Sequence, residues 1–366
     1  MNTKVLSKGG TGVDLMMAAA IVTIVFTQFY WIFPQGNTMF SQIVSMLHFL
    51  SIETFLVLSG FTIGRTLLNV SEKREADFSS ILQFLKSSFL QIIPFYFFAL
   101  VLNYLLARAF NYPTEYSWKY LFFAQNFQSP MPAFFSESWI IPIVVFASLF
   151  LSFSLYFYYK LFKKDTKKSF LAVGILGIFV GLFLKWNYHF SVDTTTINQW
   201  DRGLKSVVIY RLDSVCIGAL FYGLNRTFNS LWLKFKKLLL ILGVLGIFFI
   251  FFGIGYFRIL IDTYSFFWNV FYLPVVSLSI AFFIPFFSEL KIGSAFFKQV
   301  TSISSLFYPI YLLHFSIVLH AMCNFYPIGS LSTFGIFLFF FFYLFITFFL
   351  GFILSLTLKK IFFLTN

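Results

Sequence analysis

The segment GVDLMMAAAIVTIVFTQFYWIF, from Gly12 to Phe33, decides the fold class of this chain. Its run of Ala, Ile, Val and Phe is long enough to cross a lipid bilayer as one helix, which needs about 20 residues. Two polar groups interrupt it, the carboxylate of Asp14 and the carboxamide of Gln28. A helix rises about 1.5 Å per residue, so these groups lie about 21 Å apart, near opposite membrane faces. The segment therefore predicts a membrane helix with polar groups at two depths.

The composition of the whole chain extends this interpretation. Of the 366 residues, 59% are hydrophobic and 11% are charged, whereas soluble domains are about 45–50% apolar and about 25% charged. Cys216 and Cys323 lie in separate apolar segments, so the sequence predicts neither a disulfide framework nor a metal site. We therefore expect an all-α, polytopic integral membrane protein that forms a single domain over residues 1–366, with the lipid bilayer as a partner.

Ten apolar segments are long enough to cross a bilayer. They lie at about 13–33, 43–68, 82–107, 138–159, 169–187, 206–224, 236–257, 267–287, 303–323 and 331–358. Most of the 26 Lys and Arg residues fall at the chain ends and in alternate connections, and positive charge favours the cytoplasmic side. We therefore expect about ten transmembrane helices with both termini in the cytoplasm. The formal charge of +13 is then a topology signal, and no nucleic-acid partner is expected.

Ionisable residues inside the apolar segments mark the candidate site. Each costs about 2.5–3.5 kcal/mol on insertion scales, so each needs a partner or a polar cavity. The second segment carries His48 and Glu53. Glu53 suits either a catalytic acid or a buried carboxylate whose hydrogen bonds orient neighbouring helices.

Two further segments hold such residues. Arg211 and Asp213 are two residues apart and so lie on different sides of a helix, where each needs a partner on another helix. Inward-facing site groups and a structural ion-pair network both fit this spacing. Tyr311 and His314 share one helix face, and His314 is either a site group or a satisfied core residue. The pair Gly177 and Gly181, four residues apart, favours close helix packing.

Four motifs give the chain a resemblance to a known family. They are ETFLVLSGF at Glu53–Phe61, FFSESW at Phe134–Trp139, WDRGLKSVVIYRLDS at Trp200–Ser214 and LFYPIYLLHF at Leu306–Phe315. In this order and spacing they resemble the membrane acyltransferase 3 family, whose ten-helix proteins move acetyl or other short acyl groups onto sugars and cell-envelope polysaccharides. The resemblance covers nearly the whole chain.

The chain departs from the family pattern in the opening helix. Family members carry an Asp, an Arg three residues later and a catalytic His near the outer end, and the matching positions here are Asp14, Met17 and Gln28. A general base must take up a proton near neutral pH, and a carboxamide does not. Gln28 is therefore able to orient or hydrogen-bond a substrate but not to deprotonate it.

Other departures share this direction. Ser88 and Gln91 stand where the family places arginines that hold the acyl donor, and Lys86 is nearby. Val144 and Val145 replace the acidic pair that usually follows the FFSESW motif. Ionic groups have thus become neutral or apolar, while the motifs of the scaffold remain.

The resemblance implies an O-acyltransferase of the bacterial inner membrane that acts on a cell-envelope glycan, with acyl-CoA as co-substrate and no bound cofactor or metal. We nominate Gln28, Glu53 and His314 as catalytic positions, with His314 as a relocated proton acceptor and Glu53 or Asp213 as its orienting carboxylate. The substrate-binding candidates, in which Arg211 would meet donor phosphates, are Asp14, Lys86, Glu137, Trp139, Arg211, Asp213 and Tyr311.

Two rival hypotheses remain open at this point. One is a noncatalytic relative that binds, exports or regulates a polysaccharide or lipid-linked sugar, and the other is an enzyme that uses a different donor. A shared cavity would favour the site hypothesis. The residues that should face it are Gln28, Glu53, Arg211, Asp213 and His314.

Overall fold

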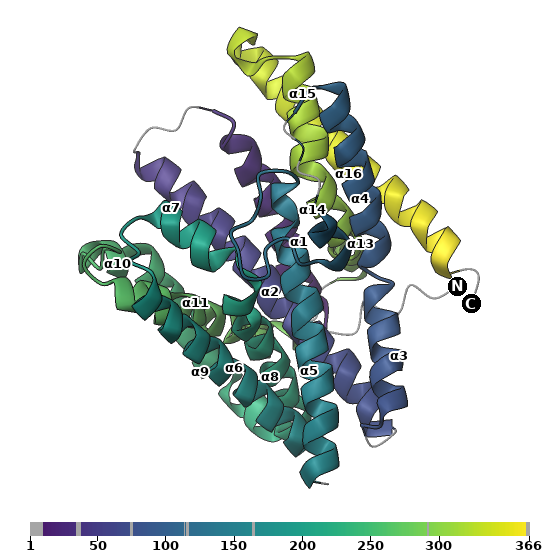
Figure 1. The fold of residues 1–366 in the computed structure, drawn as a ribbon, viewed down its shortest axis with the longest axis vertical. Helices are drawn as coiled ribbons and strands as arrows, with labels where there is room; N and C mark the ends of the chain where they lie inside the picture. The colour runs from purple at the N-terminus through teal and green to yellow at the C-terminus, as the bar shows by residue number, and fades with distance from the viewer. Residues whose placement is uncertain are drawn as a thin grey trace.

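A computed structural model describes residues 10–33, 38–73, 76–112, 114, 117–162, 165–290 and 293–363, and these residues form helices and connections without any strand. Figure 1 shows long helices packed along one another, with shorter helical pieces between them. The predicted all-α class is therefore confirmed.

The long helices have the length and composition of membrane spans. Within the described residues, eight helical stretches are long and apolar enough to cross a bilayer, and a bent pair adds a ninth. The eight are Thr11–Tyr30, Met39–Lys73, Phe78–Ala109, Ser136–Phe162, Thr166–Ser191, Asn229–Tyr256, Phe267–Phe287 and Thr333–Leu358. The prediction of a polytopic membrane protein is confirmed.

The sixth predicted segment accounts for the difference from ten spans. Its helix, α8 (Leu212–Thr227), has only 16 residues, and a span needs about 20. It packs in the centre of the molecule against α2 (Met39–Lys73). A Cβ atom on Gly218 of α8 would lie 1.8 Å from the carbonyl oxygen of Val57. Only glycine allows the two backbones to approach so closely.

A second close contact joins α8 to α6 (Thr166–Ser191). A Cβ atom on Gly177 would lie 2.4 Å from Sγ of Cys216, and one on Gly181 would lie 2.7 Å from Cβ of Asp213. The predicted packing role of this glycine pair is confirmed. The three helices α2, α6 and α8 therefore form a tight internal unit.

Two predicted spans are broken. The third becomes α3 (Phe78–Phe89) and α4 (Ile93–Ala109), with a proline in the first turn of α4. The ninth becomes α13 (Ser294–Ser305) and a helical stretch that begins with α14 (Phe307–Leu313). The segments Phe296–Ser305 and Phe307–Phe325 meet at 54°. Pro309 explains this bend, because a proline ring clashes with the carbonyl group four residues earlier and lacks the N–H that would bond it.

Among the residues that the structure describes, four segments within helices or at their ends have the wider π-helical turn. Two of them carry motif residues, η4 (Asp201–Lys205) and η8 (His314–Leu319). The other two are η6 (Phe249–Gly253) and η7 (Phe267–Phe271). π-Helical turns are rare and occur frequently at functional sites.

The remaining helices enclose this framework. They are α1 (Thr11–Tyr30), η2 (Trp118–Phe122), η3 (Ser136–Trp139), α5 (Ile140–Phe162), α7 (Ile197–Trp200), η5 (Val208–Tyr210), α9 (Asn229–Phe248), α10 (Ile254–Tyr256), α11 (Tyr272–Ala281), α12 (Ile284–Phe287), α15 (His320–Phe325), η9 (Ile328–Ser330) and α16 (Thr333–Phe363). Helices α9 and α16 expose many Phe, Leu and Ile side chains, which suits lipid-facing surfaces.

Candidate active site

A cavity of about 400 Å³ lies where α1, α2, η3, η4, α14 and η8 converge. This volume lies within the range of small-molecule sites, which is about 300–1,000 Å³. The wall combines apolar, aromatic and ionisable side chains. Its residues are Ile24, Gln28, His48, Ile52, Met131, Pro132, Ala133, Ser136, Glu137, Trp139, Asp201, Arg202, Lys205, Ser206, Tyr311, His314 and Phe315.

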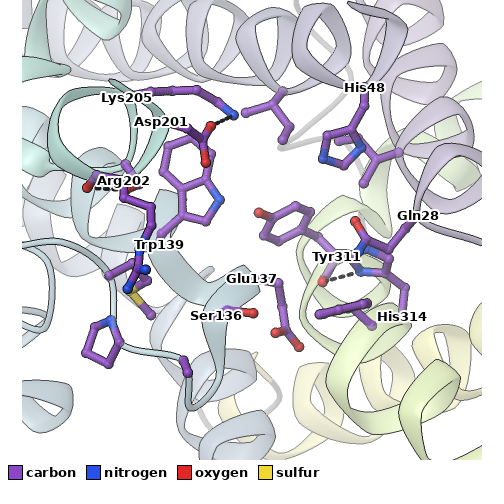
Figure 2. A pocket seen from close by; sticks show the side chains of 17 residues that line it. Gln28, His48, Ser136, Glu137, Trp139, Asp201, Arg202, Lys205, Tyr311 and His314 are labelled. Carbon is purple, nitrogen blue, oxygen red and sulfur yellow. Dashed lines mark hydrogen bonds and ion pairs between the residues drawn. The ribbon is translucent and has the colours of Figure 1, made fainter. Parts of the chain in front are cut away.

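Two imidazole rings face this cavity from different helices. Figure 2 shows His48, Gln28 and His314 on one side of the cavity, across from Trp139 and Arg202. Nδ1 of His314 lies 2.6 Å from the carbonyl oxygen of Tyr311. A carbonyl oxygen only accepts, so Nδ1 carries the hydrogen and the second ring nitrogen of neutral His314 is a proton acceptor.

The histidine of α2 is held by the first helix. Nδ1 of His48 lies 2.8 Å from Oγ1 of Thr27. That hydroxyl is also 2.8 Å from the carbonyl oxygen of Thr23 and 3.0 Å from that of Ile24. Thr27 precedes Gln28, so the imidazole of His48 stands next to the carboxamide in the wall of the cavity.

A buried carboxylate anchors the segment that carries His314. Glu137 of η3 accepts a hydrogen bond from the backbone N–H of Ser316 at 3.0 Å and another from its hydroxyl at 2.5 Å. A π-helical turn shifts the backbone pairing and leaves such an N–H in need of a partner. Glu137 supplies that partner and thereby fixes η8 against η3.

Charged groups lie at the opposite wall. Lys205 and Asp201 form an ion pair one helical turn apart. The ammonium group of Lys205 also lies over the rings of Trp139, at 5.7 Å, and Phe49, at 5.5 Å, positions that favour cation–π attraction. The guanidinium of Arg202 makes no ion pair with another described residue and reaches the cavity. This wall therefore offers a positive charge and an indole face to a ligand.

The structure separates three nominated residues from the cavity. Glu53 accepts hydrogen bonds from Arg211, from the hydroxyl of Ser214 at 2.8 Å and from that of Ser277 at 2.7 Å. Arg211 and Glu53 form an ion pair with both side chains buried. The expectation that they share a cavity with Gln28 is wrong, because each is fully enclosed among α2, α8 and α11.

Asp213 is likewise enclosed. It pairs with Lys185 of α6 at 2.5 Å, and both side chains are buried. The expectation that Asp213 or Glu53 orients His314 is wrong, since His314 bonds to the carbonyl of Tyr311 instead. The expectation that Arg211 and Asp213 each find a partner on another helix is confirmed. The two pairs form a buried ionic cluster, defined as Glu53, Arg211, Lys185 and Asp213.

Two other nominated residues lie outside the cavity. Asp14, at the start of α1, accepts hydrogen bonds from Ser304 at 3.2 Å and Thr301 at 3.4 Å on α13. Lys86 is exposed on α3. By contrast, Glu137, Trp139 and Tyr311 line the cavity with Gln28 and His314. Half of the nominated set is therefore gathered at one site.

The neutral side chains at the positions that differ from the family pattern fit their surroundings in the structure. Val144 and Val145 are buried in the apolar core, where a carboxylate without a partner would be costly. Gln91 lies in the turn between α3 and α4, and its carboxamide donates to the carbonyl of Ser87 in α3 at 3.0 Å. Met17 packs against both hydrophobic clusters of the core. These positions have become part of the packing.

Four ionisable residues of the cavity wall are not among the residues nominated from the sequence. His48, Asp201, Arg202 and Lys205 line the wall, and three of them lie in the WDRGLK stretch. The signal that pointed to His48 was its position inside an apolar segment, four residues before Ile52, which shares its helix face. The signal for the others was their place in a long connection between spans.

These observations define a class of protein, a helical membrane protein with a cavity lined by imidazole, carboxylate and indole groups. Residues 11–356 match a protein family described as an acyltransferase domain. The chain belongs to this membrane acyltransferase 3 family. No curated protein and no solved structure matches the chain.

Proposed function

We propose that this protein is an O-acyltransferase of a bacterial inner membrane. It transfers an acetyl or other short acyl group from an acyl thioester, such as acyl-CoA, to a hydroxyl group on a cell-envelope glycan. The family supports acyl transfer in general. The donor, the acceptor and the membrane are our proposal.

One observation carries this proposal. Two imidazoles, His48 and His314, line one cavity, and each has Nδ1 engaged in a hydrogen bond. Transfer to a hydroxyl requires a group that removes the hydroxyl proton, and histidine is the side chain used most often for this step. The cavity volume of about 400 Å³ admits a sugar unit together with a short acyl group.

The orientation of the chain supports an acceptor on the outer side. The distribution of Lys and Arg favours a cytoplasmic N-terminus, which places Asp14 toward the inside and Gln28 toward the outside. The cavity is at the Gln28 end of α1. The indole of Trp139 and the guanidinium of Arg202 in its wall suit the apolar faces and polar edges of a sugar.

The full-length protein in lipid nanodiscs tests this function. The substrates are acetyl-CoA labelled in its acetyl group and envelope glycan isolated from a strain that lacks the protein. We expect labelled ester on the glycan, and we expect replacement of both His48 and His314 by Gln to abolish it. His189→Gln is the matched control, because His189 contacts Asn269 outside the cavity wall.

A second candidate function has its own supporting observation. Gln28 and Met17 place neutral groups where the family has ionic ones, which favours a protein that binds or exports a glycan without acylating it. Binding of the isolated glycan with no transfer from acetyl-CoA, together with an unchanged acyl content of the envelope in the deletion strain, would replace the enzyme proposal with this one.

A further inference from the structure

Two side chains of different chemistry meet at the end of α1. Gln28 lines the cavity with a carboxamide that makes no hydrogen bond to another described residue. His48 lines the same cavity from α2, and Thr27 joins the two, because it precedes Gln28 and contacts the imidazole at 2.8 Å. A carboxamide forms hydrogen bonds but takes up no proton near neutral pH, whereas an imidazole does.

We infer that His48 is the catalytic base of the acyl transfer and that Thr27 is the positioning residue that presents it. This inference rests on the function proposed above and names the group that performs its proton transfer. The base, His48, reaches the reaction site from α2. Gln28 on α1 supplies only a hydrogen bond to the substrate.

The contacts of Thr27 fix which nitrogen of His48 is free. A threonine hydroxyl has one hydrogen, and two backbone carbonyl oxygens, of Thr23 and Ile24, lie at 2.8 and 3.0 Å from Oγ1. Carbonyl oxygens only accept, so a hydroxyl hydrogen turned toward His48 would leave the lone pairs of Oγ1 facing those of both carbonyl oxygens. The arrangement that avoids this repulsion has the hydroxyl hydrogen on a carbonyl oxygen and Nδ1–H of His48 donating to Oγ1. The hydrogen-bond network therefore leaves the lone pair on Nε2, as proton removal requires.

The other imidazole has less access to a substrate. His314 is 1% exposed, and its ring centroid lies 5.5 Å from that of Tyr311 and 6.3 Å from that of Phe315. His48 is half-buried, with part of its surface open. The base must approach the acceptor oxygen to hydrogen-bond distance, so the geometry assigns proton removal to His48 and leaves His314 as a hydrogen-bonding group of the wall.

The charged groups around the cavity are compatible with a neutral imidazole. Lys205 and Arg202 face it from η4, beside the carboxylate of Asp201, and Glu137 faces it from η3. Lys205 and Asp201 form a pair. Glu137 is occupied by Ser316. The carboxylates are therefore engaged elsewhere, and the neutral hydroxyl of Thr27 is the hydrogen-bond partner of His48 at 2.8 Å.

The step balances with an acyl thioester as donor. Nε2 of His48 takes the proton of the acceptor hydroxyl while that oxygen forms a bond to the acyl carbonyl carbon. The carbon–sulfur bond then breaks, and its electron pair stays on sulfur. The proton passes from Nε2 to the sulfur, so the products are an oxygen ester and a thiol, and His48 is neutral again.

The nanodisc assay with labelled acetyl-CoA and isolated glycan tests this assignment through single variants. We expect His48→Gln to lower kcat by about 100-fold to 10,000-fold, the range for loss of a general base, with little change in KM for acetyl-CoA. His314→Gln should retain a larger kcat. His189→Gln should match the wild type, and thermal unfolding in detergent verifies that each variant is folded.

Thr27 requires a readout that separates positioning from packing. Thr27→Val keeps the shape of the side chain and removes the hydroxyl, so we expect a fall in kcat without a matching rise in KM. Thr27→Ser keeps the hydroxyl and should restore kcat. Equal kcat for Thr27→Val and the wild type would overturn the positioning role.

Relocation of the imidazole provides the sharpest test. Adding Gln28→His to the His48→Gln variant places an imidazole at the same end of the cavity, from α1. We expect the kcat of this double variant to be at least tenfold higher than that of His48→Gln. If the wild-type protein transfers the acetyl group and His48→Gln has the same kcat, this inference is overturned and the proposed function stands. A wild-type protein that transfers no acetyl group would overturn both.

Discussion

Lys185 on α6 and Asp213 on α8 form an ion pair at 2.5 Å, and neither side chain is accessible to solvent. Removing one partner of such a pair leaves an unpaired buried charge, which costs about 3–5 kcal/mol. We expect Lys185→Met and Asp213→Asn each to lower the free energy of unfolding by about this amount. The double variant should lose less than either single variant. Denaturant unfolding of the four proteins in detergent measures this, and additive losses would contradict it.

The neighbouring pair of Glu53 and Arg211 predicts a similar loss. Glu53→Gln keeps hydrogen-bonding atoms for Ser214 and Ser277 but removes the charge opposite Arg211. We expect it to reduce the free energy of unfolding by about 3–5 kcal/mol.

Glu72→Gln is the matched control for this change. Glu72 pairs at 3.0 Å with Arg226 and at 3.9 Å with Lys167, whose side chains are 49% and 37% exposed. Exposed pairs contribute about 0–1 kcal/mol, so the control should unfold close to the wild type. A Glu53→Gln variant as stable as Glu72→Gln would show that the buried ionic cluster does not hold the helices together.

The contact between α2 and α8 predicts strong sensitivity at one glycine. A methyl group on Gly218 would meet the carbonyl of Val57 at 1.8 Å, so Gly218→Ala must push the two helices apart. Overpacking of this kind costs about 1–3 kcal/mol or more. Gly255→Ala is the control, because a Cβ atom there has nothing within 4 Å. A shift of the unfolding temperature confined to Gly218→Ala is expected, and equal temperatures would refute the close contact.

Glu137 predicts a difference between two substitutions. Glu137→Ala leaves the backbone N–H of Ser316 unpaired, and a buried donor without a partner costs about 1–3 kcal/mol. Glu137→Gln keeps an oxygen for that N–H and an amide for the hydroxyl, so it should unfold within about 1 kcal/mol of the wild type. Chemical denaturation measures both. If the two variants lost equal stability, the charge of Glu137 rather than its hydrogen bonds would anchor η8.

Local sequence patterns were enough to predict the fold class. Long apolar segments with basic connections predict membrane helices because bilayer thickness sets their length. The spacing of Arg211 and Asp213 also predicts that their partners lie on separate helices, since a two-residue step turns a helix by more than half a circle. The packing of Gly177 and Gly181 follows from the same geometry.

The composition of the cavity was less accessible from the sequence. Trp139, Glu137, Tyr311, His314 and Gln28 were nominated and line it, but their gathering depends on how the connections fold over the helices. The bend before Pro309 and the π-helical turns rotate the side chains that follow them. The position of Glu53 and Arg211 as ionisable residues inside apolar segments predicts that they belong to the site, whereas they bond to each other.

The two π-helical turns η4 and η8 affect how relatives of this chain must be compared with it. Each turn holds one residue more than an α-helical turn, so it has the effect of a single inserted residue, within a continuous helix at η8 and at the end of a helix at η4. A relative without the turn would align with a one-position gap within 201–205 or 314–319. At these turns, the residue of a relative that is equivalent to His314 or Lys205 is identified by the cavity wall that its side chain faces and not by counting along the helix.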